Sequence, residues 1–546
     1  MRPLNKLTRR NWLKMLGLLG IGSISKPLTS CTDPQSKSDS YSSPKHKPVY
    51  KTYFGDLHNH NEVGYARGSL RRAYEIARSH LDFFAFTPHA HWHDISTYSK
   101  GIEKKWIAGF EVTKTRWPEV LDMNREFDEP LKFVVIPGYE WHSTSMGDYH
   151  VLFPDLDAEL ALFDELKDLQ QFAKKRGCIM IPHHPANPAG HRGAALDFRD
   201  PDVSPVLETY SEWGNADHDR APYPYKRHTE GGRWTKNTLQ YLLSQGHRMG
   251  IVASTDDHLG FPGGYREGLA AVKTNELTRK GVFDAIRNRR TYAVTGDRIE
   301  LDFYLNEAIM GQEIAFTPER KIDVNVTGWN QVDQIEILKN NRVIHRDFPM
   351  DRIPSSRSWQ KPVLIRFDYG WGPWPALGWD RIADWDFEIT IENGTLETIH
   401  PCFAPGPLDE ARRDKIVSWN GEKAHIISFT SLKHQVDDFS QKAVILKILG
   451  DPETRLTISL KRPTEIKQTF HFKDLAESNS PLFTRDFPWE SAMVQRIVFE
   501  ENYKSSFSLV DKDDGKENNW YYARVEQCND QFAWSSPIWV DKKVKI

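Results

Sequence analysis

The first part of the chain alternates short apolar runs with stretches of helical periodicity. Apolar runs such as "TYFGDLH", "LDFFAFTPH" and "KFVVIPGYE" predict strands. The stretch "SLRRAYEIARSH" predicts a helix with Ser69 as its N-cap, and "TRKGVFDAIRNRR" predicts another that begins at Thr278. Repeated βα units predict a parallel sheet, and about seven of them favour a closed barrel over residues 50–297. A twisted open sheet is the alternative.

The hydrophobic period changes to two residues after residue 297. Stretches such as "KIDVNVTGW", "DFEITIENGTLE" and "RLTISLKRP" alternate apolar and polar positions, and Asn-Asn and Asn-Gly pairs supply turns. Residues 298–546 therefore predict a β-rich, sandwich-like domain. The expected fold class is α/β, with a barrel followed by this C-terminal β domain.

The N-terminus carries a targeting pattern rather than part of the fold. Twin arginines, Arg9 and Arg10, precede an apolar stretch too short to span a bilayer, and "LTSC" ends at Cys31. Residues 1–31 resemble a twin-arginine export signal with a lipoprotein processing box, and residues 32–49 predict a flexible tether. We expect an exported protein of the bacterial cell envelope, on the periplasmic side, anchored to the membrane by a lipid at Cys31. A simple cleaved signal with an incidental cysteine is the alternative.

Composition and charge limit the classes of molecule that this protein is expected to bind. The 546 residues are 39% hydrophobic and 27% charged, with a net charge of -3, which is typical of a soluble globular protein. No long basic run is present, so nucleic acid is not expected as a partner. Besides Cys31, the cysteines are Cys178, Cys402 and Cys528, which cannot all pair within one chain. A disulfide between Cys402 and Cys528 is one possibility, and free thiols are the other.

Histidines are concentrated in the first part of the chain. Of the 21 histidines, 15 fall between His58 and His258. In a strand, residues i and i+2 face the same side, so His58 and His60 point together, as do Asp256 and His258. Both pairs end a predicted strand, at the rim where parallel barrels place their active sites.

Other strand ends carry the same residue types. These are His89 in "FAFTPHAHW", Glu140 in "VVIPGYE", His150 in "GDYHVLFP", and His183 and His184 in "CIMIPHHP". Neutral imidazole and carboxylate are ligands for Zn, Mn or Fe. These candidate ligands outnumber the four that one tetrahedral metal ion binds. The pattern therefore predicts two or three divalent metal ions. Any one of these histidines alone is more often an ordinary hydrogen-bonded residue, so the prediction depends on the joint pattern.

The order H-x-H, T-x-H-A, P-G-x-E, a later His, H-H-P and D-x-H resembles the PHP (polymerase and histidinol phosphatase) superfamily of metal-dependent hydrolases. The strings "FGDLHNHN" and "RRTYAVTG" resemble a bacterial branch related to the metallohydrolases that include the carbaryl hydrolases. The terminal "WYYARVEQ" and "AWSSPIWV" are similar to the β extension of that branch. The resemblance implies a distorted (β/α)7 barrel with up to three metals.

The resemblance also implies roles for individual residues. His58 and His60 match the first motif and His89 the second, Glu140 would bridge two metals, and His150 and His184 would serve a further metal. Asp256 and His258 would close the site. His183 is the alternative to His184, since the two face opposite sides of a strand.

The sequence departs from the family pattern in two places. Pro88 replaces the aspartate usual in the second motif, which removes a partner for a ligand. No histidine stands six residues beyond His60, where some family members have one, and Glu62 is a possible substitute.

These residues predict a hydrolase that uses a metal-activated hydroxide on a small-molecule ester, most simply a phosphoester. A carbamate or carboxyl ester is the first alternative, and a degenerate, non-catalytic binding protein is the second. Asp256, Arg192 and Arg266 are the candidate catalytic residues, because the two arginines follow predicted strands and can bind an anion in bidentate fashion. No G-x-S-x-G motif offers a different nucleophile.

Further residues are candidates for the surroundings of the site. Asp257 and Glu212 lie near predicted rims. His91, His93 and Asp94 either extend the metal shell or line the pocket. The stretch "WGPWPALGWDRIADW" could stack on sugars, although packing is the commoner role of such residues in a β domain; its tryptophans are Trp371, Trp374, Trp379 and Trp385.

Overall fold

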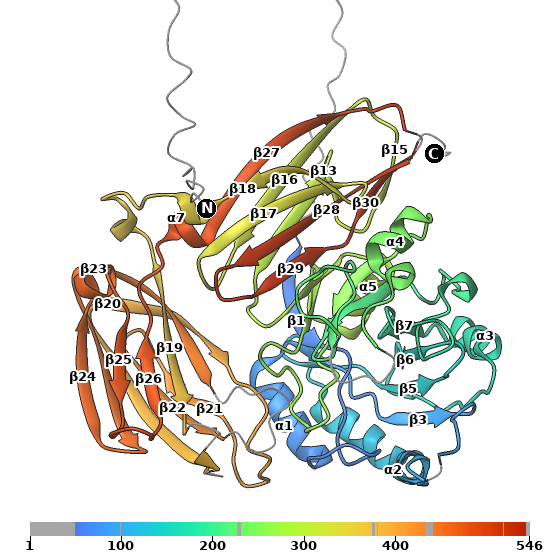
Figure 1. Cartoon of the computed structure of the whole chain (residues 1–546), viewed down its shortest axis with the longest axis horizontal. Coiled ribbons are helices and arrows are strands. Elements are labelled where there is room, and N and C mark those ends of the chain that lie inside the picture. Colours follow the sequence, from blue (N-terminus) through green and yellow to red (C-terminus); the bar gives the residue numbers. More distant parts are fainter. Residues whose placement is uncertain are drawn as a thin grey trace, which may run out of the picture. The chain divides into compact units, whose positions relative to one another are not determined.

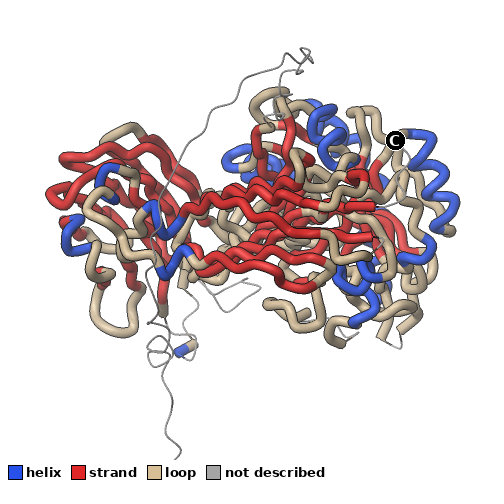
Figure 2. Tube along the Cα trace, turned by 90° about the horizontal axis from the view of Figure 1, so that it is seen from above, coloured by secondary structure: helices blue, strands red, loops and turns tan. Residues whose placement is uncertain are grey.

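The computed structural model describes residues 50–98, 100–225, 231–373, 377–378, 381–431, 441–516 and 518–541. The predicted export signal, Cys31 and the tether lie outside the described residues. The described chain is a mixed α/β protein whose strands form several sheets (Figures 1 and 2). None of its helices is both long and apolar enough to cross a membrane.

The first region, residues 50–297, contains most of the helices. They are α1 (Leu70–His80), α2 (Glu103–Phe127), α3 (Leu166–Arg176), α4 (Leu239–Ser244) and α5 (Arg279–Arg287). The Ser69 hydroxyl accepts a hydrogen bond from the Arg72 amide, and Thr278 does the same for Gly281. Both predicted N-caps are therefore confirmed, and each satisfies one amide that a helix start leaves unpaired.

The strands of the first region belong to three sheets. They are β1 (Lys51–Asp56), β2 (Phe83–Phe84), β3 (His89–Trp92), β4 (Val134–Val135), β5 (Gly138–His142), β6 (Asp148–Leu152), β7 (Ile179–His183), β8 (Val206–Ser211), β9 (Gly214–Asn215), β10 (Gly250–Ala253), β11 (Leu269–Thr274) and β12 (Thr291–Val294). One sheet runs β12-β11-β1-β2-β4, a second is β3-β5-β6-β7, and a third is β10-β8-β9.

The hydrogen bonding does not show the closed ring of seven parallel strands that the sequence predicts. Pairs β1–β2, β2–β4, β3–β5 and β8–β10 are parallel, but β6, β11 and β12 pair with their neighbours antiparallel. Pro88 separates β2 from β3, and Pro137 separates β4 from β5. Proline has no amide hydrogen to donate to a neighbouring strand. At each proline the strand ends, and the next strand of the chain belongs to a different sheet.

The C-terminal region, residues 298–541, is strand-rich, as predicted. One group of strands comprises β13 (Glu300–Leu305), β14 (Ala308–Ile309), β15 (Glu313–Ala315), β16 (Glu319–Thr327), β17 (Val332–Lys339), β18 (Arg342–Asp347), β27 (Lys504–Lys512), β28 (Asn518–Gln527), β29 (Phe532–Ser535) and β30 (Ile538–Asp541). The other comprises β19 (Val363–Trp371), β20 (Ala383–Cys402), β21 (Lys415–Trp419), β22 (Lys423–Thr430), β23 (Lys442–Arg462), β24 (Ile466–His471), β25 (Ser480–Phe483) and β26 (Ser491–Val494). Two single-turn helices, α6 (Phe472–Leu475) and α7 (Glu500–Tyr503), also occur.

These two groups are not one sandwich. Strands β19 to β26 form an eight-stranded sheet with its own apolar core, which includes Ile365, Phe367 and Trp385. In the other group, the sheet of the first region is continued by β15, β17, β18, β28, β29 and β30, because β29 pairs with β12 through Tyr292 opposite Ser535. Strands β13, β14, β16 and β27 form a separate four-stranded sheet. The predicted boundary after residue 297 therefore does not interrupt the hydrogen bonding of this sheet.

Cys178, Cys402 and Cys528 are all free thiols, so Cys402 and Cys528 do not form the disulfide that the sequence left open as one possibility. Cys402 is buried, and its sulfur accepts a hydrogen bond from Arg366 at 3.5 Å, whereas Cys528 is exposed after β28. The alternative of free cysteines is the correct one.

His80 closes α1 and predicts how stability depends on pH. Its Nδ1 lies 2.9 Å from the Ile76 carbonyl, and burial together with Arg298 lowers its pKa to about 4. The unfolded chain then binds more protons than the folded chain between about pH 4 and 6.5, so stability falls as pH falls through this range. We expect His80 to account for up to about 3 kcal/mol of that loss.

Urea unfolding of wild-type protein and His80→Gln at pH 7 and pH 4.5 measures this contribution. The variant is expected to lose less stability on acidification than the wild type. His471→Gln, on β24, serves as the control and should keep the wild-type slope. Identical slopes for His80→Gln and wild type would contradict the assignment.

Candidate metal centre

Two short segments that follow β1 and β10 lie side by side and form one side of the site. Asn59 and Asp257 form a parallel bridge, the His60 amide donates to the Asp257 carbonyl at 2.9 Å, and the Asp256 amide donates to the His58 carbonyl at 2.8 Å. The predicted pairs His58/His60 and Asp256/His258 thus flank one bridge. They lie just beyond the strand ends rather than within the strands.

The sheet β3-β5-β6-β7 supplies the opposite side of the site. Glu140 on β5 pairs with His89 on β3 and with His150 on β6, and His183 on β7 pairs with Asp148 on β6. Directly opposed residues project from the same face of a sheet. The register therefore puts a row of imidazoles and carboxylates on one face.

The first group of side chains surrounds His58. His58, His150, His183 and Glu208 are buried, and one nitrogen or oxygen of each lies within 4.8 Å of the others. The His58 Nδ1 is 3.2 Å from Glu208 Oε2, and the His150 Nε2 is 3.6 Å from the same oxygen. Three imidazoles and one carboxylate match the ligand set of a transition metal.

The second group surrounds His60. His60, His89 and His258 meet within the same 4.8 Å limit, and Glu140 lies between this group and the first. Glu140 Oε2 is 3.5 Å from His89 Nε2 and 3.7 Å from His60 Nε2, whereas its Oε1 is 3.9 Å from His58 Nε2. One carboxylate therefore faces both groups with different oxygens.

Asp256 and His184 complete the arrangement. Asp256 Oδ1 is 2.9 Å from His60 Nε2 and 3.3 Å from His58 Nε2, and its Oδ2 is 2.8 Å from His184 Nε2. His183 reaches Glu140, so the structure brings both histidines of "HHP" to the site. Asp256 and His184 have φ values of 53° and 43°, a region that costs non-glycine residues energy and is found where function holds a side chain in place.

Two members of the site were not predicted from the sequence. His142 follows Glu140 by two residues on β5, and its Nε2 is 3.2 Å from Glu140 Oε2. The two-residue spacing that selected the His58/His60 pair would have found it. Glu208 is the other, and its signal was a carboxylate in the middle of the apolar run "SPVLETYSE".

Burial decides the charge state of the imidazoles. It lowers the pKa of His58, His89 and His150 well below the usual value, and with His60 it lowers the pKa of His258 to about 4. These rings are neutral at pH 7, which is the form that binds metal.

The carboxylates respond differently to burial. It opposes ionisation of Glu140, but His142 and His183 outweigh it and hold the pKa of Glu140 well below the usual range. For Glu208, burial and the nearby Asp256 raise the pKa well above the usual value. His142 balances the negative charge, since Glu140 and Asp148 outweigh burial and raise its pKa to about 9.

Several buried polar atoms of the site lack hydrogen-bond partners among the described residues. They include both ring nitrogens of His142, His150 and His183, and Glu140 Oε2. The Nε2 atoms of His142 and His183 are close to Glu140 but do not have the geometry of a hydrogen bond. Leaving such atoms unpaired in a buried site is costly, and they are rare in folded proteins. A cation among them would satisfy both the nitrogens and the carboxylate, so the donor set fits metal ions.

The two candidate arginines occupy different places. Arg192 donates from Nε and Nη2 to Asp148 Oδ2 at 2.8 and 2.6 Å, and Asp148 Oδ1 is 3.4 Å from His142 Nδ1. Arg192 thus reaches the cluster through Asp148. Arg266 instead lines two cavities formed with C-terminal strands.

Other candidates lie outside the cluster. Glu62 is exposed and pairs with Arg116, so it does not replace a ligand. Asp94 accepts hydrogen bonds from the amides of Thr144 and Ser145. His91 lies 2.8 Å from the exposed Asp164, and that pair forms a separate group with His93.

Two further carboxylates were candidates. Asp257 accepts from the amides of Leu259 and Phe261, which fixes the loop after β10. Glu212 lines a second cavity with Arg266.

Two tryptophans of the Trp-rich stretch lie among the described residues. Trp385 is fully buried in the core of the β19–β26 sheet, which is a packing role. Trp371 lines a cavity. Trp374 and Trp379 lie outside the described residues.

Comparisons with known proteins identify uncharacterized relatives. The family described as "Protein of unknown function (DUF3604)" matches residues 264–317. An uncharacterized protein of Chlamydia pneumoniae is 26% identical over 260 residues, 43% of this chain and 41% of its own length. One from Chlamydia muridarum is 27% identical over 273 residues, 44% of this chain and 43% of its own. The chain thus spans about two fifths of the length of the curated relatives it matches.

Among solved structures, a two-domain protein from Bacteroides vulgatus is similar at 12% identity, over 79% of this chain and 100% of its own. It is described as containing a predicted PHP-like metal-dependent phosphoesterase. The TM-score is 0.27, so this likeness carries no argument about fold or activity. The relation to carbaryl hydrolases receives no support from these comparisons.

The pair of Arg192 and Asp148 predicts a stability effect. Asp148 is fully buried, so Arg192→Met leaves a buried carboxylate whose remaining partners are His142 and the Ser143 amide. We expect the free energy of unfolding in urea at pH 7 to fall by about 3 kcal/mol. Arg71→Met removes an exposed pair with Glu126 and should cost less than about 1 kcal/mol. Equal costs for the two variants would contradict the structural role of Arg192.

Proposed function

We propose that this protein is a multi-metal hydrolase that acts on phosphoesters. The observation that carries the proposal is the buried cluster of imidazoles and carboxylates, many of whose ring nitrogens have no hydrogen-bond partner among the described residues. Such a donor set suits Zn, Mn or Fe, and two or three ions would balance its carboxylates. The order of its motifs, which resembles the PHP superfamily and its distorted (β/α)7 barrel, supports the same class.

Two groups of residues would hold the ions. His58, His150, His183 and Glu208 would form one set, and His60, His89 and His258 would form another, with Glu140 and Asp256 between them. His184 would hold Asp256 in position at 2.8 Å. Bound ions would supply a strong nucleophile from water near neutral pH and positive charge for the anionic substrate.

The side of the cluster nearest His258 is open to substrate. His258 is 30% exposed, whereas His58, His142 and His150 are fully buried. The His258 Nδ1 lies 2.9 Å from the Asp256 carbonyl and 3.7 Å from Asp256 Oδ1, which orients the ring. The ring of Trp213 lies edge-on to it at 5.7 Å and would shape the entrance. Arg192 would act as a positioning residue through Asp148 and His142.

The position of the protein in the cell belongs to the same proposal. The twin arginines and "LTSC" favour export and a lipid anchor at Cys31, with the hydrolase on the periplasmic side of the envelope. The substrate would then be a small-molecule ester available in that compartment.

Removing ligands tests the metal assignment. We expect His58→Ala with His60→Ala to lower the bound metal per chain, measured by elemental analysis, and to reduce turnover by at least about a hundredfold. His345→Ala, on β18, is the matched control and should keep both values. The near-ultraviolet circular dichroism of the C-terminal aromatics should persist in the double variant. Full activity, or unchanged metal content, in the double variant would refute the assignment.

A substrate panel separates the ester classes. We expect p-nitrophenyl phosphate or bis-p-nitrophenyl phosphate to be hydrolysed, with loss of activity in EDTA and recovery on adding Zn, Mn or Fe. Turnover of aryl carbamates or carboxyl esters, with no phosphate release, would favour the alternative bond. Fewer than one ion per chain and no turnover of any compound would favour the degenerate binding protein.

A further inference from the structure

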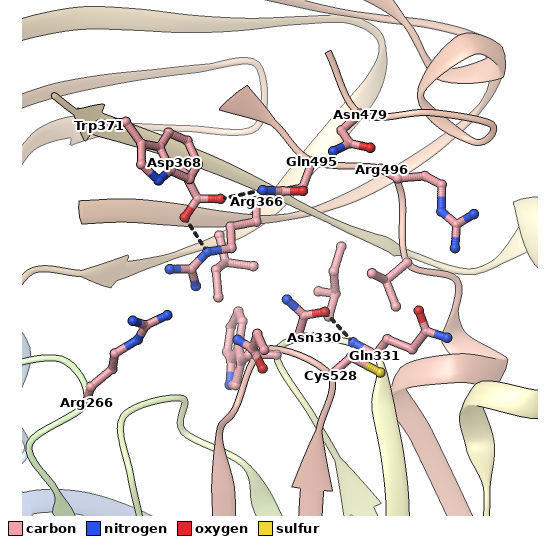
Figure 3. A pocket seen from close by; sticks show the side chains of 15 residues that line it. Arg266, Asn330, Gln331, Arg366, Asp368, Trp371, Asn479, Gln495, Arg496 and Cys528 are labelled. Atoms are coloured by element: carbon pink, nitrogen blue, oxygen red, sulfur yellow. Dashed lines mark hydrogen bonds and ion pairs between the residues drawn. The ribbon is translucent and has the colours of Figure 1, made fainter. Parts of the chain in front are cut away.

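We propose that a cavity between β19 and the turns after β16 and β28 binds an anionic saccharide, independently of the metal cluster. The cavity has a volume of about 500 Å³, within the range of small-molecule sites. Its walls come from β19, from the loop between β16 and β17, from the segment after β26 and from the turn after β28 (Figure 3). Arg266, from the loop before β11, adds a further wall.

The alternation of β19 explains why one side of this strand is polar. Val363, Ile365, Phe367 and Tyr369 face the core of the eight-stranded sheet. The intervening residues, Leu364, Arg366 and Asp368, project to the other side and line the cavity. A strand that only packed against a second layer would carry apolar residues there, so an arginine and an aspartate at these positions need another explanation.

Arg366 is held in place but keeps donors for a ligand. Its Nε donates to Asp368 at 2.7 Å, and its Nη1 donates to the Tyr265 hydroxyl at 3.0 Å. Its Nη2 has no partner among the described residues. Asp368 is fixed in turn by Gln495, which donates to it at 3.0 Å. A guanidinium that is fixed on one edge and open on another is suited to bind a carboxylate or sulfate.

The charge of the lining favours an anion. Arg266, Arg366 and Arg496 line the cavity, and Asp368 is its one acidic residue among those described. In Figure 3, Arg266 and Arg496 lie on opposite sides of the cavity, with Arg366 between them. The positive charge is therefore spread along the cavity, which suits a ligand with more than one acidic group.

The uncharged part of the lining favours a saccharide. Asparagine and glutamine side chains offer both donors and acceptors, which match hydroxyl groups. The amide side chains in the wall are Asn330, Gln331, Asn479, Gln495 and Asn529. Trp329 and Trp371 add aromatic surface against which the CH groups of a sugar ring can pack.

Binding of oligosaccharides to the purified full chain tests this proposal. By isothermal titration calorimetry we expect tetragalacturonate or a chondroitin sulfate tetrasaccharide to bind with one site per chain, and neutral cellotetraose to bind at least about tenfold more weakly. Trp371→Ala with Arg496→Gln should weaken the binding of the acidic saccharide by at least about tenfold.

Matched variants keep the test specific. Trp419→Ala with Arg342→Gln changes an exposed tryptophan and an exposed arginine outside the cavity, and it should keep the wild-type affinity. His58→Ala with His60→Ala should also keep it, so failure of the metal assignment and failure of this proposal are distinguishable.

Four results would overturn the saccharide site. Three of them are no saturable binding of either acidic saccharide, equal binding of cellotetraose, and unchanged affinity in the variant Trp371→Ala with Arg496→Gln. The fourth is tighter binding of ATP, an anion that is not an acidic saccharide, than of both saccharides.

Discussion

The structure of the first region depends on the cost of burying many imidazoles and carboxylates together. Glu140, Glu208 and Asp256 are each almost fully buried, and each lies within 4 Å of at least one histidine nitrogen. Isolated burial of such charges would cost several kcal/mol apiece. Imidazoles beside the carboxylates offset part of this cost, and cations among the ring nitrogens that lack hydrogen bonds would complete the balance.

Pro88 and Pro137 lie where the chain passes from one sheet of the first region to the next. Each proline ends one sheet and lets the chain continue in the next, so that His89 and Glu140 begin or occupy strands of the second sheet. Glu140 still receives a backbone connection, since its amide donates to the Pro88 carbonyl at 2.9 Å. The departure from the usual second motif at Pro88 therefore falls at the junction between the two sheets, directly before His89.

The C-terminal strands have two separate tasks. Strands β28, β29 and β30 extend the sheet of the first region, which gives both regions a shared apolar core. Strands β19 to β26 keep a core of their own and turn a polar face outward from β19. Strands β28, β29 and β30 therefore stabilise the fold. The polar residues on the outer face of β19 are not explained by packing alone.

The sequence by itself determined the local features. The caps at Ser69 and Thr278, the strand-rich character after residue 297 and most of the residues that meet at the cluster follow from short-range periodicity and spacing. Tertiary structure alone decided how the sheets divide, that β12 pairs with β29, and that His142 and Glu208 join the cluster while Glu62 and Arg266 lie elsewhere. The physical reason is that residue spacing fixes which face of a strand a side chain occupies, whereas the partner of that face depends on contacts between residues far apart in the chain.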